Sequence, residues 1–257
     1  MTQNGSSIRK GRVLPIFPIY LTSPNQAAHL LLEGRRLICL VRHGQTDWNQ
    51  IKRLQGREEV PLNGTGRLQA ACTAIIFRRC LSIGVHFGTV CTSPLSRAAD
   101  TAGYITAALA SPADTDPALL TPSEPLVVLP SLIERDYGSL SGLTLEERRS
   151  LFPGGEKQAG NVESVPAAAA RLFSAIDDML EAVPDKAIIG VTHGGIINAG
   201  FSRLTSGEIG TGKTLTVNCS ASLIAAGIGS PVPLAYNLQE DGIFEYFRKM
   251  IRSGAEF

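Results

Sequence analysis

The sequence predicts an α/β domain with a mostly parallel central sheet, helices on both faces and a short lid insertion. Two patterns predict the sheet and its helices. Short apolar runs of β-forming residues recur along the chain, and amphipathic helical stripes lie between several of them. Near-continuous apolar strands separated by such helices are typical of a sheet buried on both sides. A chain of 257 residues that is 44% hydrophobic can bury a core without disulfides.

The expected elements follow in chain order. We expect strands at 36–41, 89–92, 126–129, 187–192 and 220–225, each a short apolar run. Within 67–83, and again within 172–183, apolar residues recur every three or four positions, which predicts helices. Further helices are expected to open in 93–97 and to span 196–204, and residues 215–220 have the composition of β structure.

One domain is expected at 36–257, preceded by an N-terminal extension at 1–35. The first 32 residues contain no Asp or Glu, and their apolar run is broken by Pro15 and Pro18, which disfavours a signal peptide. We expect this arm to lie on the domain, and its burial against a second subunit would give a homodimer. Proline and glycine cluster on both sides of 126–129, and we interpret 136–165 as a partial lid over the site.

Charge and cysteine content narrow the class of protein. A net charge of +1 gives no reason to expect nucleic acid or an acidic membrane as a partner. The five cysteines are scattered without a C-x-x-C pair, which favours reduced thiols. No run approaches the roughly 18 apolar residues of a membrane span. We therefore expect a cytoplasmic protein that does not enter the membrane.

Charged side chains follow four of the predicted strands. The carboxyl ends of parallel strands share one edge of a sheet, where ligands bind. Guanidinium and imidazole groups suit phosphate, and phosphoryl transfer needs charge neutralisation, a nucleophile and a proton donor. No Asp/Asn cluster or H-x-x-x-H pair predicts a metal. We expect a small phosphomonoester, with neither metal nor cofactor, at a catalytic group of Arg42, His43, Arg97, Glu134 and His193.

The segment LVRHGQTDWN at 40–49 resembles the R-H-G-[EQ]-[ST]-x-W-N signature of the histidine phosphatase (phosphoglycerate mutase-like) superfamily. The resemblance continues in QG at 55–56, PL at 61–62, SPLSRA at 93–98, ERDYG at 134–138 and THGG at 192–195. It covers about residues 36–226 and implies a phosphoglycerate mutase-like fold. The short segment after Gly142 is similar to the lids of the phosphatase branch.

The resemblance also implies roles for individual residues. His43 would be the nucleophile that becomes phosphohistidine, and Arg42, Arg97 and His193 would bind the phosphoryl oxygens. Glu134 would protonate the leaving oxygen and then deprotonate the attacking water. The implied activity is that of a metal-independent histidine acid-type phosphatase. Contacts to phosphate or substrate are further expected from Asn49, Gln55, Gly56, Arg135, Tyr137 and Gly194.

Three other functions stay open on the sequence. A cofactor-dependent phosphoglycerate mutase is the main alternative, because ERDYG is close to the mutase form, although the W-R-R-x-[SY]-like segment of mutases is missing and Gly195 replaces their Asn. A catalytically inactive phosphate-binding module is a second. The third is a P-loop NTPase, from GEIGTGKT at 207–214, which we interpret instead as a glycine-rich turn because a P-loop needs a strand before it and a helix after it.

Overall fold

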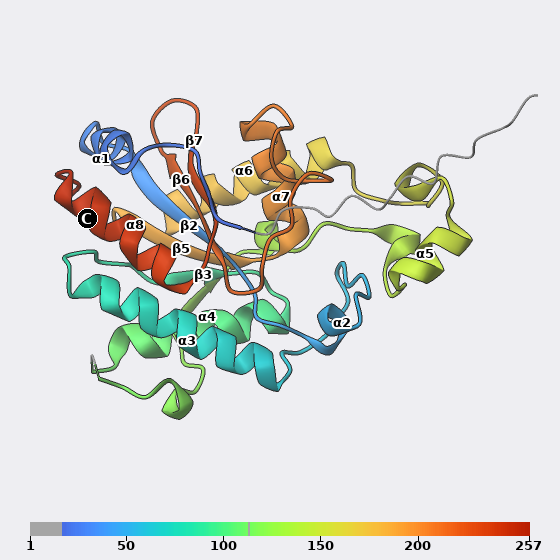
Figure 1. Cartoon of the computed structure of the whole chain (residues 1–257), viewed down its shortest axis with the longest axis horizontal. Helices are drawn as coiled ribbons and strands as arrows, with labels where there is room; N and C mark the ends of the chain where they lie inside the picture. The colour runs from blue at the N-terminus through green and yellow to red at the C-terminus, as the bar shows by residue number, and fades with distance from the viewer. Residues whose placement is uncertain (1–16, 113) are drawn as a thin grey trace, which may run out of the picture.

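A seven-stranded mixed sheet forms the centre of the computed structural model, which describes residues 17–112 and 114–257 (Figure 1). The strand order is β1-β7-β6-β2-β5-β3-β4. β2, β5, β3 and β4 run parallel to one another, whereas β6, β7 and β1 are joined by antiparallel pairing. The strands are β1 (Ile19–Tyr20), β2 (Arg36–Arg42), β3 (Val90–Thr92), β4 (Leu126–Val128), β5 (Ala187–Thr192), β6 (Ala221–Ala226) and β7 (Val232–Leu238).

Helices cover both faces of the sheet. Along β2, Leu37 and Cys39 pack into the same core as α1, α3, α4 and α8, while Ile38 and Leu40 face α6 and α7. This alternation is that of a strand buried on both sides. The helices are α1 (Pro24–Leu32), α2 (Asp47–Gln50), α3 (Gly64–Leu81), α4 (Ser96–Ala110), α5 (Leu145–Leu151), α6 (Val165–Ala182), α7 (Gly194–Leu204) and α8 (Glu240–Arg252).

The strand register brings the candidate residues together. Arg42 on β2 is paired with Thr192 on β5, so His43 and His193 leave the sheet side by side. Thr92 at the end of β3 pairs with Val191, and Ser93 follows at the same edge. The carboxyl ends of three parallel strands therefore meet at one place.

The predicted fold class is confirmed, and the five expected strands occur within one residue of their expected bounds. Both striped helices are longer than expected at their N-termini, because Asn63 and Ser164 cap them with side-chain oxygens. The expectation of β structure at 215–220 is wrong. The backbone of this loop is bonded by side chains and not by a neighbouring strand. The Val217 N–H donates to Asn237 Oδ1 at 2.7 Å, and the Thr216 carbonyl accepts from Arg42.

Residues 17–35 add an edge strand and a helix to the domain. β1 pairs with β7, and α1 packs on α8 with Ala27 and Ala28 fully buried. Residues 1–16 of the expected N-terminal extension lie outside the described residues. None of the helices in the described ranges is both long and apolar enough to cross a membrane.

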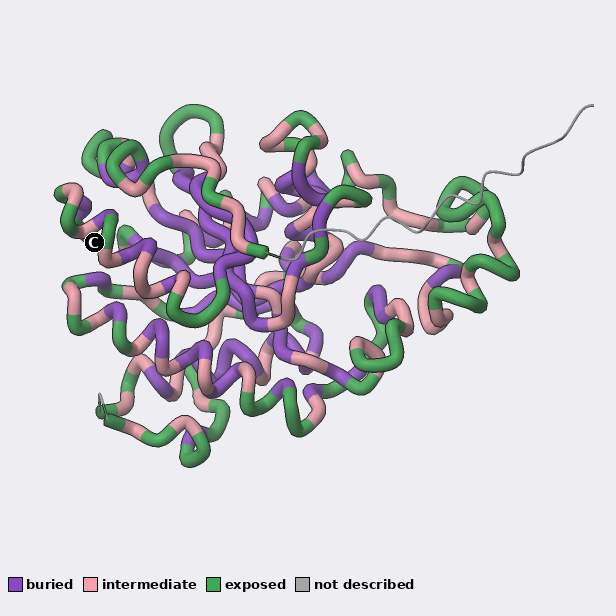
Figure 2. The backbone as a smooth tube through the Cα atoms, viewed as in Figure 1, coloured by how far each residue is buried: buried purple, intermediate pink, exposed green. Residues whose placement is uncertain are grey.

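The expected lid segment projects from one end of the body (Figure 1). It carries α5 and two short 3-10 turns, and its backbone is mostly exposed or half-buried, in contrast to the buried centre (Figure 2). The Glu163 N–H donates to the Asp136 carbonyl at 2.8 Å and closes the base of the segment. Two further bonds, from Gly142 N to Leu54 O and from Leu54 N to Leu143 O, fasten it to the loop after α2.

Candidate active site

A cavity of 220 Å³ opens at the carboxyl ends of β2, β3 and β5. The first turn of α7, the loop after α2 and the loop before β6 complete its wall. Most of the residues expected at the site line it. The lining residues are Arg42, His43, Asn49, Arg53, Leu54, Gln55, Gly56, Arg97, Glu134, Tyr137, Gly194, Gly195, Asn198, Leu215 and Thr216.

His43 is a buried imidazole that the structure holds in one orientation. Its Nδ1 lies 2.7 Å from the Gly44 carbonyl oxygen, which can only accept, so Nδ1 carries the proton and Nε2 keeps its lone pair. Burial, followed by the positive charges of Arg42 and Arg97, lowers the pKa of His43 well below 6.5. His43 is therefore neutral near pH 7, and its Nε2 is able to attack an electrophile.

His193 is fully buried beside His43, with 5.1 Å between the two ring centroids. Its Nε2 lies 2.7 Å from Ser93 Oγ, while no group in the described ranges bonds its buried Nδ1. Burial and the neighbouring His43 and Arg97 lower the pKa of His193 well below its ordinary value. A buried nitrogen without a partner is costly unless a ligand supplies one.

Arg42 and Arg97 hold two positive charges at the cavity without a carboxylate partner among the described residues. Arg97 is completely buried and donates from Nη1 to Glu58 O at 2.7 Å and from Nη2 to Gly56 O at 2.8 Å. Arg42 donates from Nη1 to the Thr216 carbonyl. The Nε of each is buried without a partner, although burial lowers the pKa of both groups only from a very high ordinary value. This arrangement suits an anion.

Glu134 is held against the N-terminus of α7. Its Oε1 accepts hydrogen bonds from the N–H groups of Arg135, at 2.7 Å, and Ile196, at 2.9 Å. Its Oε2 accepts one, from Gly195 N–H at 3.0 Å. These donors fix the Glu134 carboxyl group at the cavity wall. Among the described residues, Oε2 accepts a hydrogen bond from Gly195 alone, which leaves room for a second partner on the cavity side.

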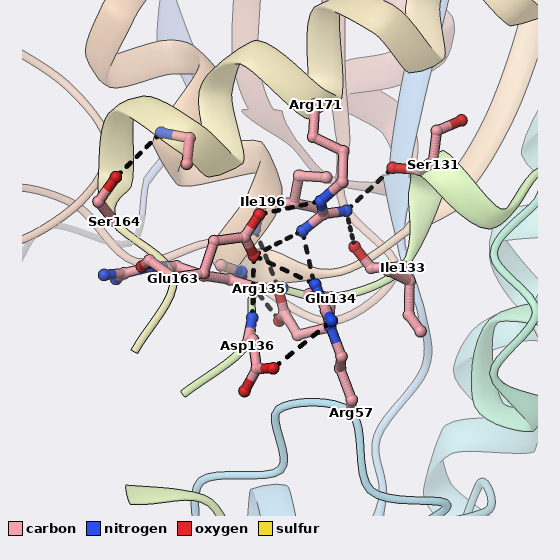
Figure 3. Close-up of polar contacts among 12 residues, drawn as sticks. Arg57, Ser131, Ile133, Glu134, Arg135, Asp136, Glu163, Ser164, Arg171 and Ile196 are labelled. Atoms are coloured by element: carbon pink, nitrogen blue, oxygen red, sulfur yellow. Dashed lines mark hydrogen bonds and ion pairs between the residues drawn. The ribbon is translucent and has the colours of Figure 1, made fainter. Parts of the chain in front are cut away.

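A second layer of charged groups fixes the backbone around Glu134 (Figure 3). The Arg171 guanidinium donates to the carbonyls of Ser131 and Ile133 and, at 3.3 Å, to that of Glu134. Arg57 Nε donates to the same Glu134 carbonyl at 3.2 Å. These bonds reach Glu134 from two separate segments, so its backbone has little freedom to move.

Glu163 joins these arginines to one another. Its carboxylate accepts from Arg171 Nε at 3.0 Å and Nη2 at 2.8 Å, and also from the N–H of Asp136 at 3.0 Å. Arg57 Nη2 lies 3.5 Å away. Burial alone would raise the pKa of Glu163, but the bonds from Arg171 and Asp136 outweigh it and lower the pKa below its ordinary value. Glu163 is therefore an ionised centre of the layer behind Glu134.

Four of the expected contact residues line the cavity. Asn49 lines the cavity with its Oδ1 accepting from Thr46 N–H and Asn218 Nδ2, each at 3.2 Å. Gln55 also lines it, and its Oε1 is buried without a partner. Gly56 adopts a left-handed φ of 54°, which turns its carbonyl toward Arg97. Gly194 lies beside Arg42, where a Cβ would meet the Arg42 Nε at 3.3 Å.

Tyr137 and Arg135 differ in position although they are close in sequence. Tyr137 lines the cavity, and burial raises its pKa above the ordinary value, so the phenol is neutral. Arg135 does not line the cavity. Its guanidinium forms a bidentate ion pair with Glu156, at 3.0 and 2.7 Å, and Nε donates to the Glu163 carbonyl. In this structure Arg135 holds the lid segment rather than a ligand in the cavity.

Several lining residues were not expected from the sequence. Arg53, Asn198, Leu215 and Thr216 all border the cavity, and Asn218 donates to the His43 carbonyl at 3.0 Å. Three of these five lie in the loop between α7 and β6, which carries no motif for a binding wall. Its one motif, at 207–214, follows a helix and leads into an irregular loop, so it lacks the strand and helix of a P-loop. The sequence offered one signal for these residues, their position in the chain. The loop leads into β6, which pairs with β2, so it passes the end of β2 where Arg42 and His43 lie.

Taken together, the neutral imidazole, the two unpaired guanidiniums and the fixed carboxylate at one sheet edge define a class of α/β protein built to hold a phosphoryl group. The comparisons with known proteins agree with this class. Residues 38–239 match the model of the histidine phosphatase superfamily (branch 1), and the chain belongs to this family. The family resemblance read from the sequence is confirmed.

Individual relatives cover most of the chain. The uncharacterized phosphatase PhoE of Bacillus subtilis (strain 168) is 33% identical over 187 residues, which cover 73% of this chain and 86% of the relative. A metal-independent phosphoserine phosphatase of Arabidopsis thaliana is 31% identical over 203 residues, or 73% and 75% of the two chains. A mycobacterial glucosyl-3-phosphoglycerate phosphatase, solved with VO3, shares the fold with a TM-score of 0.62 at 23% identity, covering 79% of this chain and 98% of that one.

Proposed function

We propose that this protein is a metal-independent phosphomonoester hydrolase that acts through a phosphohistidine intermediate on a small phosphorylated metabolite. One observation carries the proposal: His43 is neutral, with its Nε2 lone pair beside the guanidiniums of Arg42 and Arg97, which have no carboxylate partner among the described residues. A nucleophile and an anion site therefore share one cavity. The named phosphatases among the relatives support the hydrolase class.

In the first step, the Nε2 lone pair of His43 attacks phosphorus, and an N–P bond forms as the P–O bond to the alcohol breaks. Glu134 enters this step as the carboxylic acid, gives its proton from Oε2 to the leaving oxygen, and becomes the carboxylate. Arg42, Arg97 and His193 donate to the phosphoryl oxygens and offset the charge on them. The Nδ1–H of His43 stays bonded to the Gly44 carbonyl throughout.

In the second step, water attacks the phosphorus of phosphohistidine while the Glu134 carboxylate takes a proton from it. The N–P bond breaks, inorganic phosphate leaves, and His43 returns to its neutral form. The charge on the phosphoryl group is met by arginines, so no metal ion enters the proposed chemistry. The described part of the chain contains no cluster of three or more His, Cys, Asp or Glu suited to a metal.

The size of the cavity favours a small substrate. At 220 Å³ it is below the roughly 300–1,000 Å³ of pockets that enclose drug-sized ligands. A phosphoglycerate mutase is the second candidate, because such an enzyme needs the same phosphohistidine. The position of Arg135 weighs against it here, since the guanidinium is bound to Glu156 rather than free for a substrate carboxylate.

The test is an assay of the whole chain, in EDTA, against p-nitrophenyl phosphate and a panel that includes 3-phosphoglycerate with 2,3-bisphosphoglycerate. We expect phosphate release that disappears in His43→Ala and persists in His86→Ala, a matched control at an exposed histidine away from the cavity. Alkaline quenching with ³²P-labelled substrate should trap label on the wild type and on His86→Ala, but not on His43→Ala. Isomerisation of 3-phosphoglycerate without net phosphate release would instead establish the mutase.

The role of Glu134 is tested by the leaving group. p-Nitrophenolate departs without a proton, whereas an alkoxide does not. In rapid-quench measurements of the first step, Glu134→Gln should slow alkyl phosphates about 10²- to 10⁴-fold and p-nitrophenyl phosphate far less. An equal loss for both substrates would contradict a proton transfer from Glu134.

A further inference from the structure

Asn198 is a polar residue on the cavity wall to which the steps above give no role. It lies on α7 and is half-buried. Two hydrogen bonds of its side chain are made at the oxygen: Thr216 Oγ1 donates to Oδ1 at 2.7 Å, and the Tyr236 hydroxyl donates at 2.6 Å. Within residues 17–112 and 114–257, no protein group is hydrogen-bonded to its Nδ2.

A chain of hydroxyl groups fixes which way this amide faces. The Gly210 N–H donates to Thr214 Oγ1 at 2.9 Å, so the hydroxyl proton of Thr214 points onward to Tyr236, also at 2.9 Å, rather than to the Gly210 carbonyl at 3.5 Å. Having accepted this bond, the Tyr236 hydroxyl has two further neighbours, Asn198 at 2.6 Å and Thr216 Oγ1 at 3.1 Å. We assign its proton to the nearer one, which makes the Asn198 atom facing Tyr236 the amide oxygen.

Burial supports this direction of the chain. Tyr236 is fully buried, and Thr214 and Thr216 are each 4% exposed, so solvent does not reorient the hydroxyls. Burial also raises the pKa of Tyr236, which keeps the phenol protonated and able to donate. The NH₂ group of Asn198 is left as a fixed donor with no acceptor in the part of the chain that the structure describes.

The helix places this donor on the side of the proposed leaving group. Gly195 binds Glu134 Oε2 through its N–H, and Asn198 lies three residues further along, on the same face of α7. The donor of Asn198 is therefore one helical turn from the carboxyl that would protonate the departing oxygen.

We propose that Asn198 is a specificity-determining residue, whose side-chain N–H donates to an oxygen acceptor on the alcohol portion of the substrate. This inference rests on the proposed phosphatase function and narrows its substrates to phosphomonoesters that carry a carboxylate, hydroxyl or carbonyl oxygen near the ester. Thr214, Thr216 and Tyr236 are positioning residues that hold the amide. The glycine-rich loop at 207–216 thereby shapes substrate choice and does not bind a nucleotide.

The test compares matched substrates that differ only in the acceptor: 2-phosphoglycolate against ethyl phosphate, and glycerol 3-phosphate against propyl phosphate. The readout is the ratio of kcat/KM within each pair. Asn198→Asp keeps the acceptor for Thr216 and Tyr236, and so the fold, but presents an oxygen in place of the donor. Asn198→Leu removes the amide, and Asn25→Asp is the control on an exposed residue of α1.

We expect the wild type to prefer the oxygen-bearing member of at least one pair, and both Asn198 variants to lower that ratio about five- to ten-fold. Tyr236→Phe should lower it less, because Thr216 still holds the amide. A ratio near one in the wild type, or an unchanged ratio in both variants, overturns the role of Asn198 while hydrolysis dependent on His43 leaves the phosphatase standing. A protein that cleaves p-nitrophenyl phosphate but none of these four esters also overturns it, and no hydrolysis of any ester overturns both proposals.

Discussion

The close approach of α3 to the loop after β2 offers a sharp test of how the candidate nucleophile is positioned. A Cβ on Gly66 would lie 2.0 Å from the Gln45 carbonyl oxygen and 2.7 Å from its nitrogen. Both obstacles are backbone atoms, so no side-chain rotation relieves them. Gly66→Ala must push α3 and the segment after His43 apart by roughly 1.4 Å, from 2.0 Å to the 3.4 Å at which ordinary contacts begin.

Two magnitudes follow from this displacement. Overpacking that moves backbone costs about 1–3 kcal/mol, and the upper end applies here; in a domain of this size it corresponds to a Tm lower by roughly 6–12 °C. A misplacement of about 1 Å in a catalytic group costs on the order of 100-fold in rate. We therefore expect Gly66→Ala to lose both stability and most activity.

Thermal unfolding by circular dichroism and initial rates on p-nitrophenyl phosphate measure the two effects. Gly64→Ala is the matched control, because it lies in the same turn of α3 and its Cβ would meet only Arg67 Nη2, at 4.0 Å. This variant should keep full activity, and its free energy of unfolding should rise by up to about 1 kcal/mol. If Gly66→Ala melts within a degree of the wild type and retains its rate, the argument that the glycine contact positions His43 is wrong.

Three further outcomes are expected. The pKa of His43 is lowered by burial and by Arg42 and Arg97, so the acid limb of kcat/KM that reflects its protonation should lie below pH 6.5; a limb above that pH contradicts a neutral nucleophile. Glu163→Gln should lower the free energy of unfolding by about 2 kcal/mol at pH 7, because it removes charged hydrogen bonds to Arg171. The lowered pKa of Glu163 means that the ionised side chain stabilises the fold above pH 4.5. Urea titrations should therefore show the difference between variant and wild type fading as the pH falls below that value. Lys213→Ala should leave phosphate release unchanged, and Mg-ATP should not raise the Tm of the wild type, whereas a clear rise would restore the P-loop interpretation.

Much of the sheet could be predicted because its central strands are buried on both faces. Residues 36–41 and 187–192 are nearly continuous apolar runs. Such a run identifies a buried strand from its own sequence, without knowledge of the strands that pair with it. The residues directly after them, His43 and His193, then follow at the same edge by geometry alone. For these two strands, the local sequence alone predicts that they lie in the centre of the sheet.

The antiparallel half of the sheet was harder to predict. β7 contains Pro233, and its Asn237 is buried and polar, so its sequence does not show the alternation of an ordinary strand. Asn237 serves the loop before β6 by accepting from the Val217 N–H. β7 forms because it pairs with β6 and β1, and this pairing cannot be read from the sequence of β7 alone.

Side-chain direction was the other limit on prediction. Arg135 follows Glu134 directly, and the sequence gives no reason to separate them. Their paths diverge because Glu156, 21 residues later in the lid segment, binds the Arg135 guanidinium in a bidentate pair. Similarly, the orientation of Asn198 depends on Thr216 and Tyr236, 18 and 38 residues away. Such contacts exist only after the chain has folded.

The site keeps its opposite charges apart, and this separation explains how a buried cavity remains ready for an anion. Carbonyl groups hold the guanidiniums of Arg42 and Arg97, which fixes their position without cancelling their charge. Backbone N–H groups hold Glu134, the one acidic side chain among the lining residues of the described chain. A direct Arg–Glu pair would bind more tightly but would neutralise both partners. Burial and then the same positive charges lower the pKa of His43 and keep it neutral, so the anion site and the nucleophile share one arrangement.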